Sequence, residues 1–280
     1  MQKGKVRLDQ YLVDFGLAKD LKLASSLILS GSILVNDRTE SKVGTKISLT
    51  DQVRVKDKIK TYVSRGAYKL LGAFEKFPNL TVQNKICVDL GSSTGGFCQV
   101  LLEKNAKQVF AVDVGYGLLA QKIANHPKVT VLDRTHVKDL SWEQISSNLK
   151  YQKTDEKNNL TSDWERLNQG YVATSPYFFS MDLSFISLSI VFSHLKNLFQ
   201  SSPKMPIDGV SLLKPQFELP ARYLDRGVVK NSKILGPCIR SVWRKIKENN
   251  KDFFLKGLAE SPIRGADGNR EFLIFWEFRR

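Results

Sequence analysis

The sequence predicts an α/β protein in which a small basic α+β module, residues 5–56, precedes a larger domain, residues 62–280, built on a doubly wound, mostly parallel sheet. Three observations lead to this prediction. Apolar runs of strand length alternate with helical stretches along the second segment. One of these runs leads into a glycine-rich turn and then a helix. A chain of 280 residues suits one large and one small domain.

The first segment shows two short helical patterns and then short strands. Apolar residues at helical spacing begin near Val6 and stop at Gly16. A second helix is predicted from Asp20, a residue type that caps helix N-termini, to Gly31. Strand-like runs follow at residues 33–35, 47–49 and 53–55. We interpret the polar residues 57–61 as a linker.

The second segment contains seven strand-like runs, at residues 85–90, 108–112, 129–132, 178–183, 209–213, 255–260 and 272–277. Helical stretches lie between most of them. The last two runs are joined by the turn-rich residues 261–269 without a long helix, so we expect them to pair antiparallel at one edge of the sheet. The polar residues 150–176 are expected to form a surface insertion.

Composition excludes several classes of protein. The chain has 43 Lys and Arg against 28 Asp and Glu, a net charge of +15, which favours a nucleic acid partner. It has no apolar run long enough to span a membrane and no apolar segment typical of a secretory signal, so we expect a cytoplasmic protein without membrane insertion. The three cysteines, Cys87, Cys98 and Cys238, have neither disulfide-framework nor metal-ligand spacing, and no metal is expected.

The glycine-rich turn is the strongest local signal for a ligand site. It follows the strand at residues 86–90 and precedes a helix starting near Phe97, and its spacing matches neither a dinucleotide motif nor a phosphate loop. Asp113 ends the next strand, where it could bind ribose hydroxyls. Asp133 ends the third, where it could reach an adenine amino group or be a solvated turn residue. The candidate cofactor-binding residues are Asp89, Gly91, Ser92, Ser93, Thr94, Gly95, Gly96, Phe97, Asp113 and Asp133. A glycine turn and a ribose-binding acid without a phosphate motif suggest S-adenosylmethionine.

Six segments then carry a family resemblance: YVSRGAYKL at 62–70, VDLGSSTGGF at 88–97, AVDVGYG at 111–117, DLSFIS at 182–187, LKPQFE at 213–218 and GNREF at 268–272. In this order they resemble the FtsJ-type ribose methyltransferases, and the complete chain is similar to the TlyA, or hemolysin A, family. The first module resembles the alpha-L RNA-binding domain named after small-subunit ribosomal protein S-four. The resemblance implies a Rossmann-like class I methyltransferase fold and S-adenosylmethionine-dependent 2′-O-methylation of ribosomal RNA, with cytidine as the target.

The resemblance also implies a catalytic tetrad of Lys69, Asp182, Lys214 and Glu271. A ribose hydroxyl is a weak nucleophile, and a lysine can act as its general base when a nearby cation lowers its pKa. We therefore expect Lys214 to be the base, Lys69 to orient the hydroxyl, and the two acids to hold the two ammonium groups. Ribosomal RNA or ribosomal subunits are the expected partners. The candidate RNA-binding residues are Arg7, Lys22, Arg38 and Arg65.

Two other classes of function are compatible with the sequence. A membrane-acting cytolysin is suggested by the hemolysin label, and the cations of the chain could adhere to anionic lipid. An RNA-binding protein with an inactive methyltransferase fold is the other alternative, and the intact tetrad counts against it.

Overall fold

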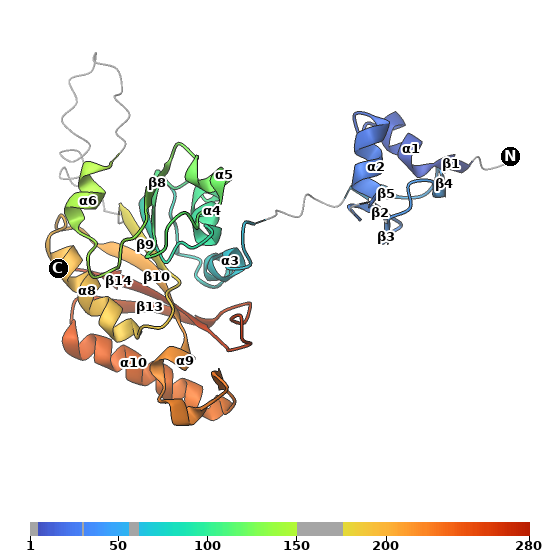
Figure 1. Cartoon of the computed structure of the whole chain (residues 1–280). Coiled ribbons are helices and arrows are strands. Elements are labelled where there is room, and N and C mark those ends of the chain that lie inside the picture. Colours follow the sequence, from blue (N-terminus) through green and yellow to red (C-terminus); the bar gives the residue numbers. More distant parts are fainter. Residues whose placement is uncertain (1–4, 30, 56–61, 150–175) are drawn as a thin grey trace, which may run out of the picture. The chain divides into compact units, whose positions relative to one another are not determined.

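The computed structural model describes residues 5–29, 31–55, 62–149 and 176–280. The chain divides into two compact units, Met1–Thr61 and Tyr62–Arg280 (Figure 1). The expected linker at 57–61 and the expected insertion at 150–176, apart from Pro176, lie outside the described residues.

The small unit packs two helices against short strands. Helix α1 (Leu8–Asp14) and helix α2 (Leu21–Leu29) supply most of its core. Asp20 caps α2 as predicted, because its Oδ1 accepts a hydrogen bond of 2.7 Å from the Leu23 N–H. The strands are β1 (Lys5–Arg7), β2 (Ile33–Val35), β3 (Arg38–Glu40), β4 (Lys46–Ser48) and β5 (Val53–Val55). Strand β2 lies between β3 and β5, and β1 pairs with β4, all antiparallel.

The described part of the large unit is organised on a seven-stranded sheet with the order β13-β14-β10-β9-β6-β7-β8. Its strands are β6 (Ile86–Leu90), β7 (Gln108–Val112), β8 (Val129–Leu132), β9 (Tyr177–Met181), β10 (Ile207–Leu213), β13 (Phe253–Glu260) and β14 (Phe272–Phe278). The strands β6 to β10 are parallel, whereas β14 is antiparallel to both β10 and β13. The predicted fold class and its antiparallel edge are therefore confirmed.

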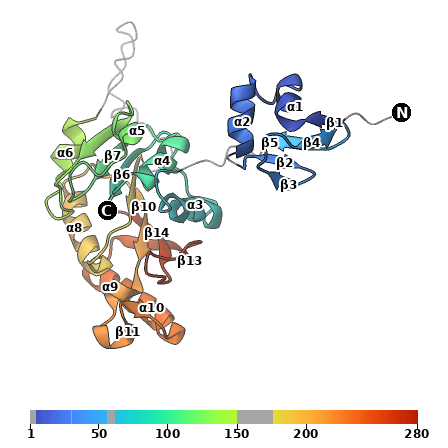
Figure 2. The same cartoon turned by 45° about the vertical axis from the view of Figure 1, so that its right-hand side comes forward.

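Helices cover both faces of this sheet (Figure 2). The longer ones are α3 (Ala67–Lys76), α4 (Gly96–Glu103), α8 (Leu188–Gln200) and α10 (Leu235–Asn249), and the shorter ones are α5 (Gln121–Ala124), α6 (Trp142–Ser147) and α9 (Pro215–Glu218). Helices α3, α4 and α5 share one hydrophobic cluster with one face of the sheet, and α6, α8 and α10 share another with the opposite face. No helix in the described parts of the chain is long and apolar enough to cross a membrane.

Aromatic rings fill the core between α8 and the antiparallel edge. Phe192 lies 4.7 Å from Phe253 and 5.3 Å from Trp276, measured between ring centroids. The Trp276 indole N–H donates a 2.7 Å hydrogen bond to Ser211 Oγ, so its polar atom is satisfied inside the core. Gly209 is the cross-strand partner of Trp276, and a Cβ at this position would collide with the indole ring. A glycine is therefore required in this strand for a packing reason.

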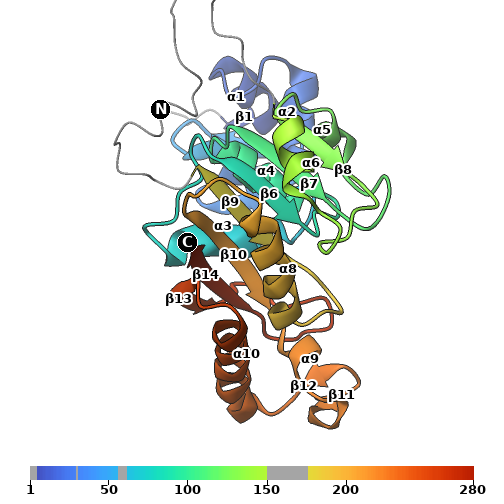
Figure 3. The same ribbon diagram turned by 90° about the vertical axis from the view of Figure 1, so that its left-hand side faces the viewer.

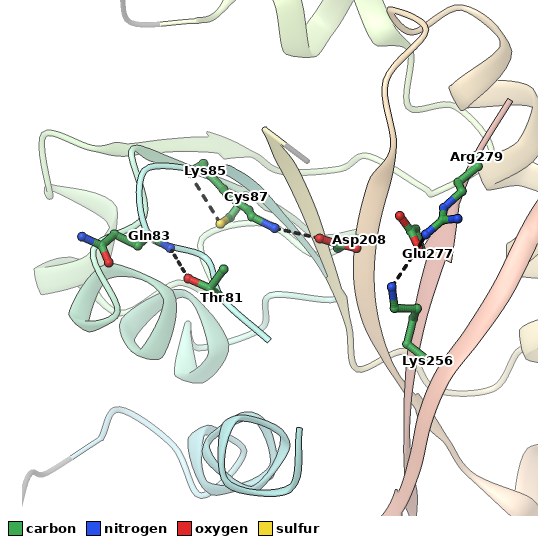
Figure 4. Close-up of polar contacts among 8 residues, drawn as sticks. All are labelled: Thr81, Gln83, Lys85, Cys87, Asp208, Lys256, Glu277 and Arg279. Carbon is green, nitrogen blue, oxygen red and sulfur yellow. Dashed lines mark hydrogen bonds and ion pairs between the residues drawn. The ribbon is translucent and has the colours of Figure 1, made fainter. Parts of the chain in front are cut away.

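Charged side chains gather at the end of the sheet where β6 and β10 begin (Figure 4). Asp208 and Glu277 are direct partners across β10 and β14, an arrangement in which two carboxylates repel each other. Lys85 neutralises Asp208 at 2.7 Å, and its side chain is only 5% exposed. Glu277 is held by Lys256 at 3.0 Å and by Arg279 at 2.6 Å. Each acid thus has its own cation, which makes the like-charged register tolerable.

The buried pair of Lys85 and Asp208 gives a stability prediction. The substitution Asp208→Asn leaves the Lys85 ammonium buried without a counter-charge, so we expect the free energy of unfolding to fall by about 3 kcal/mol. Replacing both partners, Lys85→Met with Asp208→Leu, should recover most of the loss because no unpaired charge remains. Urea unfolding followed by tryptophan fluorescence measures each variant.

Lys256→Met is the matched control. Lys256 is 38% exposed and Glu277 keeps Arg279 in its absence, so the expected loss is below about 1 kcal/mol. Equal losses for Asp208→Asn and Lys256→Met would contradict the assigned role of the buried pair.

Candidate active site

The glycine turn lies at the carboxyl ends of the parallel strands, directly after β6. Gly91 has a φ of +79°, and a Cβ there would lie 2.9 Å from the Asp182 carbonyl oxygen. Gly96 begins α4, and a Cβ there would collide with the Ser64 hydroxyl. The two glycines therefore let the turn approach both the loop after β9 and the segment before α3, as a side chain would not.

Two cavities open beside this turn, of about 390 Å³ and about 550 Å³. They meet at Gly91, Ser93 and Asp182, which line both. The predicted cofactor-binding residues that line the first cavity are Gly91, Ser92, Ser93, Thr94, Gly96 and Phe97. Predicted Asp113 lines the second, together with Thr135, His136 and Val137.

The two strand-end acids are placed differently. The Asp113 carboxylate accepts hydrogen bonds of 2.8 Å from the backbone N–H groups of both Ser93 and Gly115, which ties it to the glycine turn. Asp133 accepts a 2.9 Å hydrogen bond from the Gly117 N–H and is not among the residues lining either cavity. Asp113 thus lines the second cavity, whereas Asp133 supports the loop at Gly117.

Asp89 is fully buried beneath the turn and lines neither cavity. Its Oδ1 accepts a 2.7 Å hydrogen bond from Ser180 Oγ, and its Oδ2 accepts one of 3.0 Å from Cys98 Sγ. Burial raises the pKa of Asp89 to about 6, against the opposing effect of these two hydrogen bonds. The carboxylate therefore joins β6 to β9 and to α4, and it supports the turn from below.

The four residues of the expected tetrad come together in space. Lys69 Nζ, on α3, lies 3.0 Å from Asp182 Oδ2 and 2.8 Å from Glu271 Oε2. Lys214 Nζ, after β10, lies 2.7 Å from Asp182 Oδ1 and 3.0 Å from Ser184 Oγ. The four side chains are between 3% and 19% exposed. Two cations and two acids thus form one largely buried cluster at the edge of the first cavity, where Lys69 and Asp182 line the wall.

The two lysines have unequal surroundings. Burial lowers the pKa of Lys69, but the carboxylates of Asp182 and Glu271 outweigh it, and the pKa ends above its usual value. Burial raises the pKa of Asp182, but Lys214 and Lys69 outweigh it, and the pKa ends below its usual value. Lys69 is therefore a fixed cation between two acids, whereas Lys214 faces one carboxylate and one hydroxyl.

Ser184, Glu218 and Phe185 extend the site beyond the predicted residues. Glu218 accepts hydrogen bonds of 2.7 Å from Ser187 Oγ and 2.8 Å from the Leu188 N–H, which joins the loops after β9 and β10. Phe185 lines the second cavity, is 90% exposed and has a φ of +63°, which a bulky residue rarely adopts. All three stand inside the DLSFIS and LKPQFE segments, so the motifs themselves contained the signal.

The candidate RNA-binding residues are distributed over both units. Arg65 is exposed and lines the first cavity. Arg7 forms an ion pair with Asp9 at 2.7 Å, which occupies part of its guanidinium. Lys22 and Arg38 are exposed on the small unit. Within the described residues, no group of three or more His, Cys, Asp or Glu side chains could hold a metal ion.

Comparison with known proteins identifies the family. A model described as FtsJ-like methyltransferase matches residues 62–278. The chain belongs to the FtsJ-like methyltransferase family. This FtsJ-like chain is 34% identical in sequence to the 16S/23S rRNA (cytidine-2′-O)-methyltransferase TlyA of Mycobacterium tuberculosis. The match covers 97% of this chain and 89% of that protein. It is 32% identical in sequence to Hemolysin A of Brachyspira hyodysenteriae, in a match that covers 96% of this chain and 98% of that protein.

A solved structure from Streptococcus thermophilus shows that the likeness extends to the fold of the whole FtsJ-like chain. It is 29% identical in sequence and gives a TM-score of 0.63. The match covers 99% of this chain and 90% of that one.

The buried Asp89 predicts a pH dependence of stability. Its folded pKa of about 6 lies above the ordinary value of 3.8, so its contribution to stability is greatest below about pH 4 and is lost as the pH rises through 6. We expect the wild type to lose up to about 3 kcal/mol relative to Asp89→Asn across this window, because the amide cannot ionise. Urea unfolding of both proteins from pH 3.5 to 7.5 measures the difference. A difference that stays constant over this range would contradict a raised pKa at Asp89.

Proposed function

We propose that this FtsJ-like protein transfers the methyl group of S-adenosylmethionine to the 2′-hydroxyl of a cytidine in ribosomal RNA. The observation that carries the proposal is the buried cluster of Lys69, Asp182, Lys214 and Glu271 beside a cavity lined by the glycine turn. The name of the Mycobacterium tuberculosis relative, which matches along nearly the whole chain, supports the choice of RNA, ribose and cytidine.

The residues around the turn suit S-adenosylmethionine. Gly91 and Gly96 let the turn pack closely against Asp182 and Ser64, and the first turn of α4 can offer backbone N–H groups to polar groups of a ligand. Asp113 is held by two backbone N–H groups and can still accept from ribose hydroxyls through its remaining lone pairs. When bound, S-adenosylmethionine supplies an electrophilic methyl group, and no metal is required for its transfer.

The unequal surroundings of the two lysines divide their roles. Lys214 is balanced by one acid rather than two, which favours it as the group that takes the proton from the 2′-hydroxyl. Lys69 keeps its charge, so it can orient the hydroxyl oxygen and stabilise negative charge that develops on it. Asp182 contacts both ammonium groups and fixes their separation.

An exposed aromatic ring beside the tetrad supports a nucleotide substrate. Phe185 packs against Phe217 with ring centroids 4.9 Å apart, and Lys214 Nζ lies 5.9 Å from the Phe217 ring. Bases of single-stranded RNA stack on such rings. A base on Phe185 would keep its ribose near Lys214, and the strained φ of Phe185 is consistent with a functional role.

We assign RNA affinity to the small unit, residues 5–56, as well. It carries Lys and Arg on helix α2 and on its short strands but none of the tetrad or cofactor residues. Such cations contribute binding through phosphates and have no part in the chemistry.

Mass spectrometry of nucleosides from ribosomal RNA, incubated with protein and S-adenosylmethionine, tests the function. The wild type should yield 2′-O-methylcytidine. Lys214→Ala should lower the transfer rate by at least about a hundredfold, because the base is lost, while calorimetry shows unchanged cofactor affinity. Asp113→Ala is the reciprocal variant and should lose cofactor affinity. Wild-type RNA binding without any methylation would instead support an inactive RNA-binding protein.

A chain that starts at Tyr62 tests the small unit. We expect it to keep cofactor affinity and to lose most of its affinity for ribosomal subunits, with a shallower dependence of binding on salt because fewer phosphates are neutralised. Binding is measured for both chains at several salt concentrations. Equal affinity and equal salt dependence would show that the small unit serves another partner.

A further inference from the structure

A group of exposed cations lies outside the site described so far, on the segment between α9 and the middle of α10. This segment includes two short 3₁₀ turns, η1 (Ala221–Tyr223) and η2 (Ser232–Ile234), and a hairpin of β11 (Leu224–Asp225) and β12 (Val228–Val229). The basic ridge, as we call it, consists of Arg222, Arg226, Lys230, Lys233, Arg240 and Arg244, all exposed. Between residues 219 and 244 the sequence has these six cations and a single acid, Asp225.

Two residues of the ridge share one face of helix α10. Arg240 and Arg244 are four residues apart on α10, so they lie on the same face of the helix. The opposite face of α10 is buried and packs against the core through residues such as Val242 and Ile246. Lys233 stands in the 3₁₀ turn η2, directly before α10 begins at Leu235.

Most of the ridge has no acidic partner. Lys230 and Asp225 approach only to 4.0 Å, and Arg244 has Glu248 at 3.7 Å. No ion pair to Arg226, Lys233 or Arg240 occurs among the residues that the structure describes. These charges are therefore available to an external anionic surface.

The ridge is fastened to the tetrad at two points. Helix α9 starts directly after Lys214 and leads into the hairpin. Asn269 is 2% exposed, its Oδ1 accepts a 2.9 Å hydrogen bond from the Val229 N–H, and its Nδ2 donates one of 2.9 Å to the Gly227 carbonyl. Because Asn269 lies two residues before Glu271, the hairpin is held to the loop that carries a tetrad residue. Figure 3 shows α9, β11, β12 and α10 together at one end of the large unit.

We propose that the basic ridge binds the phosphate backbone of the substrate RNA away from the target nucleotide and so sets the register of the RNA on the active site. The proposal rests on the proposed function for the identity of the RNA. Exposed Lys and Arg side chains neutralise phosphates without regard to sequence, and such contacts position a nucleic acid. An anionic membrane would satisfy the same charges, but it would have no need for a ridge that is fixed to Lys214 and Glu271. This attachment favours RNA.

A triple variant tests the ridge in the full chain. Arg226→Gln, Lys233→Gln and Arg240→Gln together remove three cations that have no ion pair in the described residues. The control triple is Lys76→Gln, Lys104→Gln and Lys204→Gln. These three exposed cations lie near the amino ends of the parallel strands, whereas the tetrad lies at their carboxyl ends. Binding to ribosomal RNA is measured at several salt concentrations, with circular dichroism to show that both variants are folded.

We expect the ridge triple to lower the slope of log affinity against log salt by about 2 to 3, roughly one unit per lost phosphate contact. Its affinity at fixed salt should fall by about tenfold or more, and the KM for RNA should rise in parallel. The control triple should change affinity by less than about threefold. Equal affinity and equal slope in the two triples would overturn the proposal.

Two further measurements separate the ridge from its alternatives. Binding to vesicles of anionic phospholipid shows whether the ridge is a membrane surface: loss of vesicle binding with unchanged RNA binding in the ridge triple would overturn the proposal. The wild-type methylation assay is independent of both. If the wild type leaves ribosomal RNA unmethylated while the ridge triple still weakens RNA binding, the proposed function fails and the ridge remains a nucleic acid surface.

Discussion

The Asp182 carboxylate between two ammonium groups is the interaction on which the rest of the large unit depends. Its two oxygens meet Lys69 at 3.0 Å and Lys214 at 2.7 Å, so one residue after β9 joins α3 to the end of β10. The same residue donates its backbone N–H to Leu90 at 3.2 Å and presents its carbonyl oxygen to Gly91. The glycine turn, helix α3 and the sheet are therefore arranged around the side chain and the peptide group of this one residue.

Charge balance makes this cluster possible. Two acids and two lysines sum to zero, and burial of an ion cluster is tolerable only when each charge has a partner at close range. The fourth member, Glu271, holds the second side of Lys69 at 2.8 Å. Removing any one member of the cluster destabilises the fold, because it leaves an uncompensated buried charge. Because Asp182 contacts both ammonium groups, it also fixes their positions relative to each other.

How much of this could be predicted from the sequence differs between elements. The strand, glycine turn and helix at residues 86–103 were identified because local hydrophobic pattern and turn chemistry agree there. The strands β1, β3, β11 and β12 were not predicted, because two or three residues are too few to show a period. Asp89 and Asp133 were grouped with the cofactor residues on position alone. Whether an acid at the end of a strand points into a cavity or under a turn depends on neighbours such as Ser180 and Gly117, which are distant in sequence.

The thiol of Cys98 has a consequence for how the motion of this site can be observed. Cys98 lies in the first turn of α4, is fully buried, and donates to Asp89, while burial holds its pKa well above the ordinary value. A thiol-modifying reagent reacts with an exposed thiolate, so in the folded protein this sulfur is protected both by burial and by its raised pKa. The rate at which Cys98 is modified therefore measures how often α4, the helix that follows the glycine turn, opens locally. Cys98 is thus a native reporter of local unfolding beneath the glycine turn. Any ligand that orders this turn would lower the rate at which Cys98 is modified.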